Sequence, residues 1–206
     1  MERMAADGKD RSDLRVGVIG GSIAGCTTAV EMLKLGCDVT LLERSGDTLK
    51  DRGVGIGLPT PVMDMFVDRA LVDMDIPRFA CGTTRRVWRT EAEPERGHHS
   101  WDQPTNLSVL NWGALYRNLR SRVPDPVYRT RQHVTAIGQL DNGARATLAD
   151  GSNLDFDLLI CADGYSSLGR RTLFPNVSMD YAGYILWRGA IPENGIADPA
   201  YLEHAI

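Results

Sequence analysis

The chain has 206 residues, of which 43% are apolar and 24% are charged, and its formal net charge is −4. This size and composition are ordinary for one large or two small globular domains, and they exclude collagen-like, coiled-coil and wholly disordered chains. The acidic balance argues against a nucleic-acid binder, because such proteins neutralise phosphates with clustered basic residues. No stretch approaches the roughly 18 apolar residues of a membrane span. We therefore expect neither nucleic acid nor membrane as a partner.

The N-terminal residues and the cysteines bear on the cellular compartment. Residues 1–13 are polar and charged, unlike a secretory signal, and we predict a disordered tail there. None of the four cysteines lies in a C-x-x-C pair, which favours reduced thiols and a cytoplasmic location. We expect no metal site, because no cluster of ligands is visible and His98-His99 lies in a polar stretch typical of solvated residues.

The first strong pattern is a strand, a glycine-rich turn, a helix and a second strand. The apolar run Leu14–Ile19 predicts a buried strand, and Cys26–Leu35 predicts a helix that stops at Gly36. Asp38–Glu43 predicts the second buried strand. This order is a βαβ unit, which favours a parallel sheet.

The rest of the chain alternates between helical and strand-like stretches. Gly53, Gly55 and Gly57 indicate an irregular segment, and Glu91–Gln103 indicates a surface loop. Turn residues separate the strands of a predicted antiparallel meander. The other predicted elements are, in chain order, helix Pro61–Met74, strand Phe79–Thr90, helix Trp112–Val123, meander strands His133–Leu140, Ala144–Leu148 and Asn153–Phe156, buried strand Leu158–Ala162, helix Ser166–Phe174 and strand Tyr181–Ala190.

The turn of the βαβ unit has the form of a nucleotide-binding turn. It consists of Gly20, Gly21, Ser22, Ile23, Ala24 and Gly25. It matches the G-x-G-x-x-G pattern with serine at the middle glycine, and such turns let backbone N–H groups and a helix N-terminus hold a pyrophosphate. Glu43 follows at close to the roughly 20-residue spacing expected of a ribose-binding carboxylate. The alternative is a glycine-rich βα turn with a surface glutamate.

The residues alone leave NAD, NADP and FAD open as the nucleotide. Glu43 would repel a 2′-phosphate and so disfavours NADP, although Arg44 beside it weakens that argument. A plain dehydrogenase usually continues with further βα units. Here an antiparallel meander comes before strand Leu158–Ala162, which is typical of FAD-binding domains built in two parts.

Several motifs resemble one enzyme family. Asp157–Arg171, DLLICADGYSSLGRR, resembles the D-G motif of the FAD-dependent aromatic hydroxylases, the p-hydroxybenzoate hydroxylase-like family. GGSIAG, LKDRGVGI, NWGALYRNL and YAGYILWRG resemble its 2,6-dihydroxypyridine 3-hydroxylase-like branch, over the N-terminal portion only. The resemblance implies an α/β, Rossmann-like FAD-binding fold with a parallel sheet, an antiparallel β-meander crossover and the start of a substrate-domain sheet. The implied domains are 14–175 for FAD, interrupted at about 75–110 by insertions, and 176–206 as an incomplete substrate domain.

The resemblance also implies the roles of matching residues. The turn Gly20–Gly25 would hold the FAD pyrophosphate and Glu43, with Arg44 beside it, the adenosine ribose. The other implied FAD contacts are Arg52, Trp112, Asp163 and Gly164, and the implied substrate residues are Trp187 and Arg188. Many relatives carry arginine at the position of Trp112. The structural alternatives are a solvated Arg52, a core Trp112 or Trp187, and an ordinary strand-end turn at Asp163-Gly164.

The implied activity is that of an oxidoreductase. NAD(P)H would reduce FAD, and O2 would supply one oxygen atom to a small aromatic substrate, so the protein itself needs no nucleophile. We identify no catalytic residue. The second Gly-Asp motif of the family and most of its substrate sheet are absent from these 206 residues, so we expect weak or no activity unless a homodimer or a separate chain supplies them. The alternatives are a nucleotide-binding remnant that has lost catalysis and an NAD-dependent Rossmann oxidoreductase.

Overall fold

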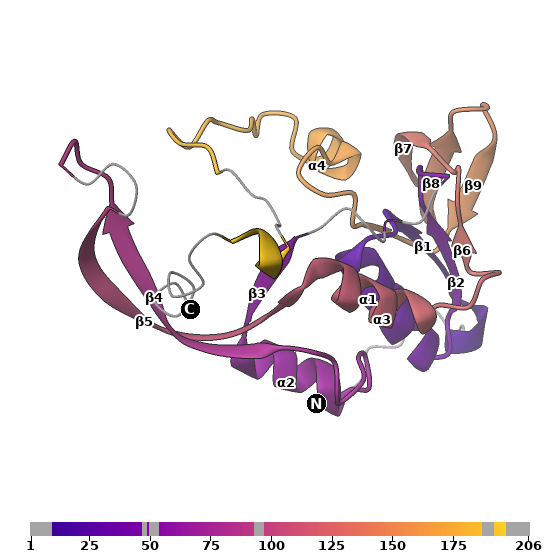
Figure 1. Cartoon of the computed structure of the whole chain (residues 1–206). Coiled ribbons are helices and arrows are strands. Elements are labelled where there is room, and N and C mark those ends of the chain that lie inside the picture. Colours follow the sequence, from indigo (N-terminus) through magenta and orange to yellow (C-terminus); the bar gives the residue numbers. More distant parts are fainter. Residues whose placement is uncertain (1–9, 47–48, 50–53, 93–96, 187–191, 197–206) are drawn as a thin grey trace, which may run out of the picture. The chain divides into compact units, whose positions relative to one another are not determined.

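The structure is a computed structural model of the whole chain, and it describes residues 10–46, 49, 54–92, 97–186 and 192–196 (Figure 1). The chain divides into two compact units. The first unit comprises residues 1–51 and 115–184, and the second comprises residues 52–114 and 185–206. The first unit holds a parallel sheet and an antiparallel meander, and the second holds one antiparallel sheet.

A four-stranded parallel sheet organises the first unit. Its strands lie in the order β10-β1-β2-β6. They are β1 (Arg15–Ile19), β2 (Asp38–Leu42), β6 (Tyr128–Arg129) and β10 (Leu158–Cys161). Helix α1 (Ile23–Lys34) packs on β1 and β2, a short 3-10 helix η1 (Arg11–Asp13) precedes β1, and α4 (Leu168–Leu173) follows β10.

The two faces of this sheet are covered by different elements. An antiparallel meander of β7 (Val134–Leu140), β8 (Gly143–Leu148) and β9 (Asn153–Phe156) packs on one face, where its side chains form a buried cluster with Ile19 and Leu42. The Phe156 ring lies so close to Gly17 that a Cβ on Gly17 would come within 2.6 Å of it. Because neighbouring strand residues point to opposite faces, Val16 and Val18 face the other side of the sheet.

The second unit is built on a three-stranded antiparallel sheet. Its order is β3-β5-β4, with β3 (Gly55–Pro59), β4 (Phe79–Trp88) and β5 (His98–Asn111). Helix α2 (Thr60–Asp68) packs on β3 and β5, and the Thr60 hydroxyl lies 3.4 Å from the buried Ser108 hydroxyl. Phe79 is 75% exposed. Helix α3 (Trp112–Ser121) begins in this unit and continues in the first, and a 3-10 helix η3 spans Glu193–Gly195.

The structure confirms the predicted fold class. The βαβ unit, the meander and the buried strand after it lie where the sequence predicts them, with ends shifted by at most three residues. Strand Phe79–Thr90 is confirmed as β4, and helices Trp112–Val123 and Ser166–Phe174 as α3 and α4. Strand β6, only two residues long, was not predicted. The predicted domain limits at 14, 175 and 206 stay predictions.

Four other predictions from the sequence were wrong in part. Gly55 and Gly57, predicted to be irregular, lie in strand β3 because β5 pairs with it, and Gly53 lies outside the described residues. The predicted loop Glu91–Gln103 is strand β5 from His98 onward, since cross-strand pairing with β4 imposes extended backbone on polar residues. Helix α2 ends at Asp68 instead of Met74, and a left-handed residue, Ala70 with φ 50°, follows it. The described part of Tyr181–Ala190, residues 181–186, lies in no strand.

Candidate cofactor site

The glycine turn lies between the ends of β1, β2 and β10. The Gly20 N–H donates to the Leu42 carbonyl at 2.8 Å, and Gly20 has a φ of 100°. A Cβ on Gly20 would lie 2.4 Å from the Ala162 carbonyl oxygen, and one on Gly25 would lie 1.7 Å from the Gly20 oxygen. Real Cβ atoms never approach backbone this closely, so both positions require glycine. The turn therefore brings bare backbone to the carboxyl edge of the sheet.

Helix α1 opens directly on this turn. Ser22 is its N-cap, and the Ser22 side chain makes no capping hydrogen bond. The first intrahelical bond runs from the Cys26 N–H to the Ser22 carbonyl at 2.8 Å, so the N–H groups of Ile23, Ala24 and Gly25 have no acceptor inside the helix. These N–H groups and the positive end of the helix dipole suit an anion such as a phosphate.

Glu43 braces the turn from the end of β2. Its side chain is buried, with one carboxylate oxygen accepting the Gly21 N–H at 2.7 Å and the other accepting the Ser45 N–H at 2.8 Å. These bonds use about half of the four or so acceptor positions of a carboxylate, so Glu43 can also accept hydroxyl groups of a ligand. Arg44, the next residue, is exposed.

Asp163 follows β10 on the other side of the turn. A Cβ on Gly20 would lie 3.1 Å from the Asp163 Cα, so the two residues are neighbours. The Asp163 Oδ2 atom accepts the Leu168 N–H at 2.6 Å, while Oδ1 is buried and has no partner. Since buried polar atoms are normally paired, Oδ1 is an acceptor suited to a ligand hydroxyl. Gly164, with a φ of 77°, is exposed.

Sequence reasoning missed three buried side chains near Gly21, of which Tyr128 and Cys26 contact Gly21 and Tyr116 contacts Tyr128. Tyr128 on β6, Tyr116 on α3 and Cys26 on α1 are all buried, and Tyr128 and Cys26 hydrogen-bond to the Gly21 carbonyl. Burial raises the pKa of Tyr128 above its usual value, and burial also raises the pKa of the Cys26 thiol to about 12. Both groups are protonated donors at neutral pH. No sequence signal marks β6, because two residues cannot show a period.

The remaining predicted site residues either lie outside the described residues or belong to the second unit. Arg52, Trp187 and Arg188 lie outside the described residues. Trp112 is half-buried, belongs to the second unit and donates its backbone N–H to the Val54 carbonyl at 3.2 Å. In the described ranges, no three His, Cys, Asp or Glu side chains gather as metal ligands, and no helix there is long and apolar enough to cross a membrane.

The site and fold define a class. A glycine turn at a helix N-terminus, an acidic residue closing the second strand and a parallel sheet crossed by a meander are the arrangement of a dinucleotide-binding α/β protein. Residues 13–187 match the family model described as FAD binding domain. The chain belongs to this family, whose cofactor is FAD.

Relatives sharpen this assignment. The chain is 25% identical over 187 residues to 2,6-dihydroxypyridine 3-monooxygenase of Paenarthrobacter nicotinovorans, covering 91% of this chain and 45% of that protein. It is 29% identical over 187 residues to a 3-amino-4-hydroxybenzoate 2-monooxygenase of Streptomyces platensis, covering 86% of this chain and 46% of that protein. The sequence relatives thus include several monooxygenases, two of them described as FAD-dependent, as the motif resemblance implies.

Solved structures share the fold. The structure of 2,6-dihydroxypyridine-3-hydroxylase from Arthrobacter nicotinovorans matches with a TM-score of 0.69 at 24% identity, over 82% of this chain and 42% of that one. Klebsiella pneumoniae HpxO complexed with FAD matches with a TM-score of 0.58 at 20% identity, over 78% and 42%. The chain spans about half the length of the curated relatives it matches.

Proposed function

We propose that this chain is the cofactor-binding part of a cytoplasmic FAD-dependent monooxygenase that uses NAD(P)H and O2 to hydroxylate an aromatic or N-heteroaromatic small molecule. Its relatives include a 2,6-dihydroxypyridine 3-monooxygenase and a 3-amino-4-hydroxybenzoate 2-monooxygenase, which supports the substrate class. The observation that carries the proposal is the glycine turn, bounded by a half-used buried carboxylate, Glu43, and an unpaired buried oxygen of Asp163.

The residues of the turn fit FAD group by group. The free N–H groups at the start of α1 would hold the pyrophosphate, the spare acceptor positions of Glu43 would bind the adenosine ribose, and Asp163 Oδ1 would accept a hydroxyl of the ribityl chain. Arg44, Arg52, Trp112 and Gly164 are proposed as further contacts, and Trp187 and Arg188 as substrate contacts. Bound FAD supplies the redox and oxygen-transfer chemistry.

The chain's own residues bind and orient the cofactor in this proposal. The turn offers N–H donors without a side chain that would block a phosphate, and Glu43 holds the turn through the Gly21 N–H at 2.7 Å. No protein nucleophile is required, so no side chain is assigned to catalysis. Activity depends on groups that exclude water from the reacting atoms.

Exposed apolar side chains support a further covering segment or chain. In the second unit Phe79, Trp88 and Trp101 are 75%, 69% and 51% exposed. Trp88 and Trp101 lie near the same end of the β4–β5 pair, where large exposed apolar residues mark an interaction surface, whereas Phe79 lies at the other end of β4. We therefore propose that a homodimer partner or a separate chain covers the substrate side, and that these 206 residues alone have weak or no hydroxylase activity. A catalytically inactive nucleotide-binding protein is the second candidate, favoured by the same exposure.

Cofactor loading tests the proposal. The purified chain is titrated with FAD and followed by flavin fluorescence and calorimetry, and we expect stoichiometric binding. Gly20→Val should abolish binding, because its side chain would meet the Ala162 carbonyl. Gly138→Val is the matched control, since Gly138 has open space around its Cβ position. A chain that binds NADH but never FAD would instead be an NAD-dependent oxidoreductase.

Turnover distinguishes the enzyme from an inactive remnant. The FAD-loaded chain is given NADH or NADPH with 2,6-dihydroxypyridine or 3-amino-4-hydroxybenzoate, and both hydroxylated product and hydrogen peroxide are measured. We expect NAD(P)H oxidation that yields mostly peroxide, because an uncovered site admits water. Absence of NAD(P)H oxidation with every aromatic tested would favour the remnant.

A further inference from the structure

The carbonyl of Gly21 points into the protein and accepts two side-chain donors. The Tyr128 hydroxyl donates to it at 2.9 Å, and the Cys26 thiol donates to it at 3.3 Å. The N–H of the same residue donates to Glu43 at 2.7 Å. Both backbone groups of Gly21 are therefore held by buried side chains from three different elements.

The direction of the hydrogen bonds between the two tyrosines follows from this geometry. The hydroxyl oxygens of Tyr116 and Tyr128 lie 3.2 Å apart. A hydroxyl has one proton, and a carbonyl cannot donate, so the Tyr128 proton is committed to the Gly21 oxygen. Tyr116 must then donate to Tyr128. The chain Tyr116 to Tyr128 to Gly21 is polarised in one direction, which strengthens each bond in a buried setting.

The ring of Tyr128 is itself held in place. The Arg120 guanidinium lies 4.1 Å from its centroid, a cation–π distance. Arg120 in turn donates to the Val123 carbonyl at 2.7 Å and to Asp125 at 2.7 Å, which fixes the guanidinium over the ring. Tyr128 thus presents its hydroxyl to the turn from a restrained position.

Because the Gly21 carbonyl is held in place, the direction of the Ser22 N–H in the same peptide is fixed as well. A trans peptide is planar, and its C=O and N–H point in opposite directions. Because the Gly21 carbonyl points at Tyr128, the Ser22 N–H of the same peptide points away from Tyr128, out of the buried cluster. Gly21 must lack a side chain here, since a Cβ would lie 2.3 Å from the Tyr128 hydroxyl oxygen.

We propose that Tyr128 is a positioning residue that, oriented by Tyr116, sets the Gly21–Ser22 peptide so that its N–H binds the cofactor pyrophosphate. This inference rests on the proposed placement of FAD at the glycine turn. It goes further by assigning cofactor affinity to a tyrosine pair that would not touch the cofactor. Glu43 acts on the preceding peptide in the same way, so the two side chains together determine the geometry of the turn.

The test compares ligands with and without a pyrophosphate. Tyr128→Phe keeps the ring and removes the donor, and calorimetry measures its binding of FAD, ADP and adenosine. We expect affinity for FAD and for ADP to fall by the same factor, about 3- to 10-fold for a lost hydrogen bond, and affinity for adenosine to stay unchanged. Tyr116→Phe should give a smaller loss of the same kind. Tyr181→Phe is the control, because Tyr181 is 74% exposed.

The outcomes separate this inference from the cofactor assignment. Equal binding of FAD and ADP by Tyr128→Phe and the unaltered chain would overturn the inference alone, as would an equal loss for adenosine. A lower unfolding midpoint with unchanged affinities would mean that Tyr128 only stabilises the fold. Failure of the unaltered chain to bind FAD or ADP would overturn the proposed function and the inference with it. If Tyr128→Phe does not fold, Tyr116→Phe is tested in the same way, by comparing its loss of affinity for FAD and ADP with its loss of affinity for adenosine.

Discussion

The sheets of the two units differ in how completely their faces are covered. In the first unit α1 packs on the parallel sheet and the meander covers its other face, with Ile19 and Leu42 both buried. In the second unit α2 packs on the antiparallel sheet, yet Phe79 and Trp88 on β4 remain 75% and 69% exposed. The parallel sheet of the first unit is therefore covered on both faces, whereas strand β4 of the second unit presents large apolar side chains to solvent, although residues such as Leu173 and Phe174 after β10 in the first unit are exposed as well.

The largest expected effect is at Gly25, in the closely packed glycine turn of the first unit. Gly25→Ala should lower the free energy of unfolding by more than about 4 kcal/mol, because its Cβ would lie 1.7 Å from the Gly20 oxygen. Helix propensity alone would favour alanine by about 1 kcal/mol, so the sign of the change identifies the clash. Urea unfolding measures it. Gly82→Ala in β4, with open space, is the control; a similar loss there would remove the distinction between the units.

Core truncation contrasts the same two sheets directly. Phe156→Ala should cost about 3–4 kcal/mol of unfolding free energy, since the ring fills the space over Gly17. Phe79→Ala should cost less than about 1 kcal/mol, since that ring is already largely in water. Chemical denaturation of both variants checks the pair. A large loss for Phe79→Ala would indicate that its surface is already covered in solution, for example by a second copy.

Substitutions of acidic residues should give a smaller difference in stability between the two units. Glu43→Gln should cost about 2 kcal/mol, because an amide can accept only one of the two backbone N–H bonds and leaves the other donor facing an NH2 group. Asp102, on exposed β5, has its pKa lowered by hydrogen bonds from His99 and then Arg85. We expect Asp102→Asn to shift the unfolding midpoint far less. Equal shifts in thermal unfolding would contradict the bracing role of Glu43.

The smallest expected effect is a pH dependence in the alkaline range. Burial raises the pKa of Cys26 from its ordinary 9.0 to about 12, so the unfolded chain releases this proton at lower pH than the folded chain does. Stability from Cys26 is present below pH 9 and is lost as pH rises, on the order of 1 kcal/mol between about pH 8 and pH 10. Cys26→Ala should flatten this decline, measured by urea midpoints across pH. Cys81→Ala should leave the alkaline decline in stability unchanged. A decline that persists in Cys26→Ala would contradict its assignment to Cys26.

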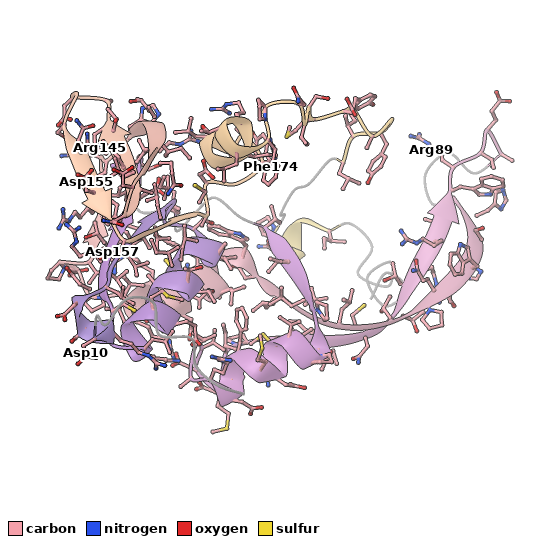
Figure 2. The ribbon with its side chains drawn as sticks, turned by 180° about the vertical axis from the view of Figure 1, so that it is seen from behind. Asp10, Arg89, Arg145, Asp155, Asp157 and Phe174 are labelled. Carbon is pink, nitrogen blue, oxygen red and sulfur yellow. The ribbon has the colours of Figure 1, made fainter. Side chains whose placement is uncertain are left out.

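The Arg145–Asp155 ion pair at the surface of the first unit is exposed to solvent, as is the Arg85–Asp102 pair of the second unit. Arg145 on β8 and Asp155 on β9 lie side by side on the meander (Figure 2), with two hydrogen bonds of 2.6 and 2.7 Å. The Arg145 hydrogen bond lowers the pKa of Asp155. Both side chains are exposed enough for water and salt to screen them. Surface ion pairs therefore do not distinguish the two units.

Local patterns were sufficient to predict the cofactor half of the fold. The turn Gly20–Gly25, its helix and the acidic end of β2 are contiguous in sequence, so their spacing alone predicts them. Strand β5 could not be found this way, because its residues are polar and Pro104 argues against a central strand. Pro104 is tolerated because the register shifts there, between the β4 residues Cys81 and Thr83. Tyr128 was missed since its role depends on a contact 107 residues away.

The central position of β1 also bears on how the chain is made. Strand β1 pairs with β10 on one side, and the Arg15 N–H donates to Asp157 across a separation of 142 residues. At roughly 5–20 residues per second, β10 is synthesised about 7 to 28 s after β1. Until then β1 keeps an open edge, and the Ala162 carbonyl that closes the glycine turn has not been made. The glycine turn can therefore reach its final form only after the meander and β10 have been synthesised.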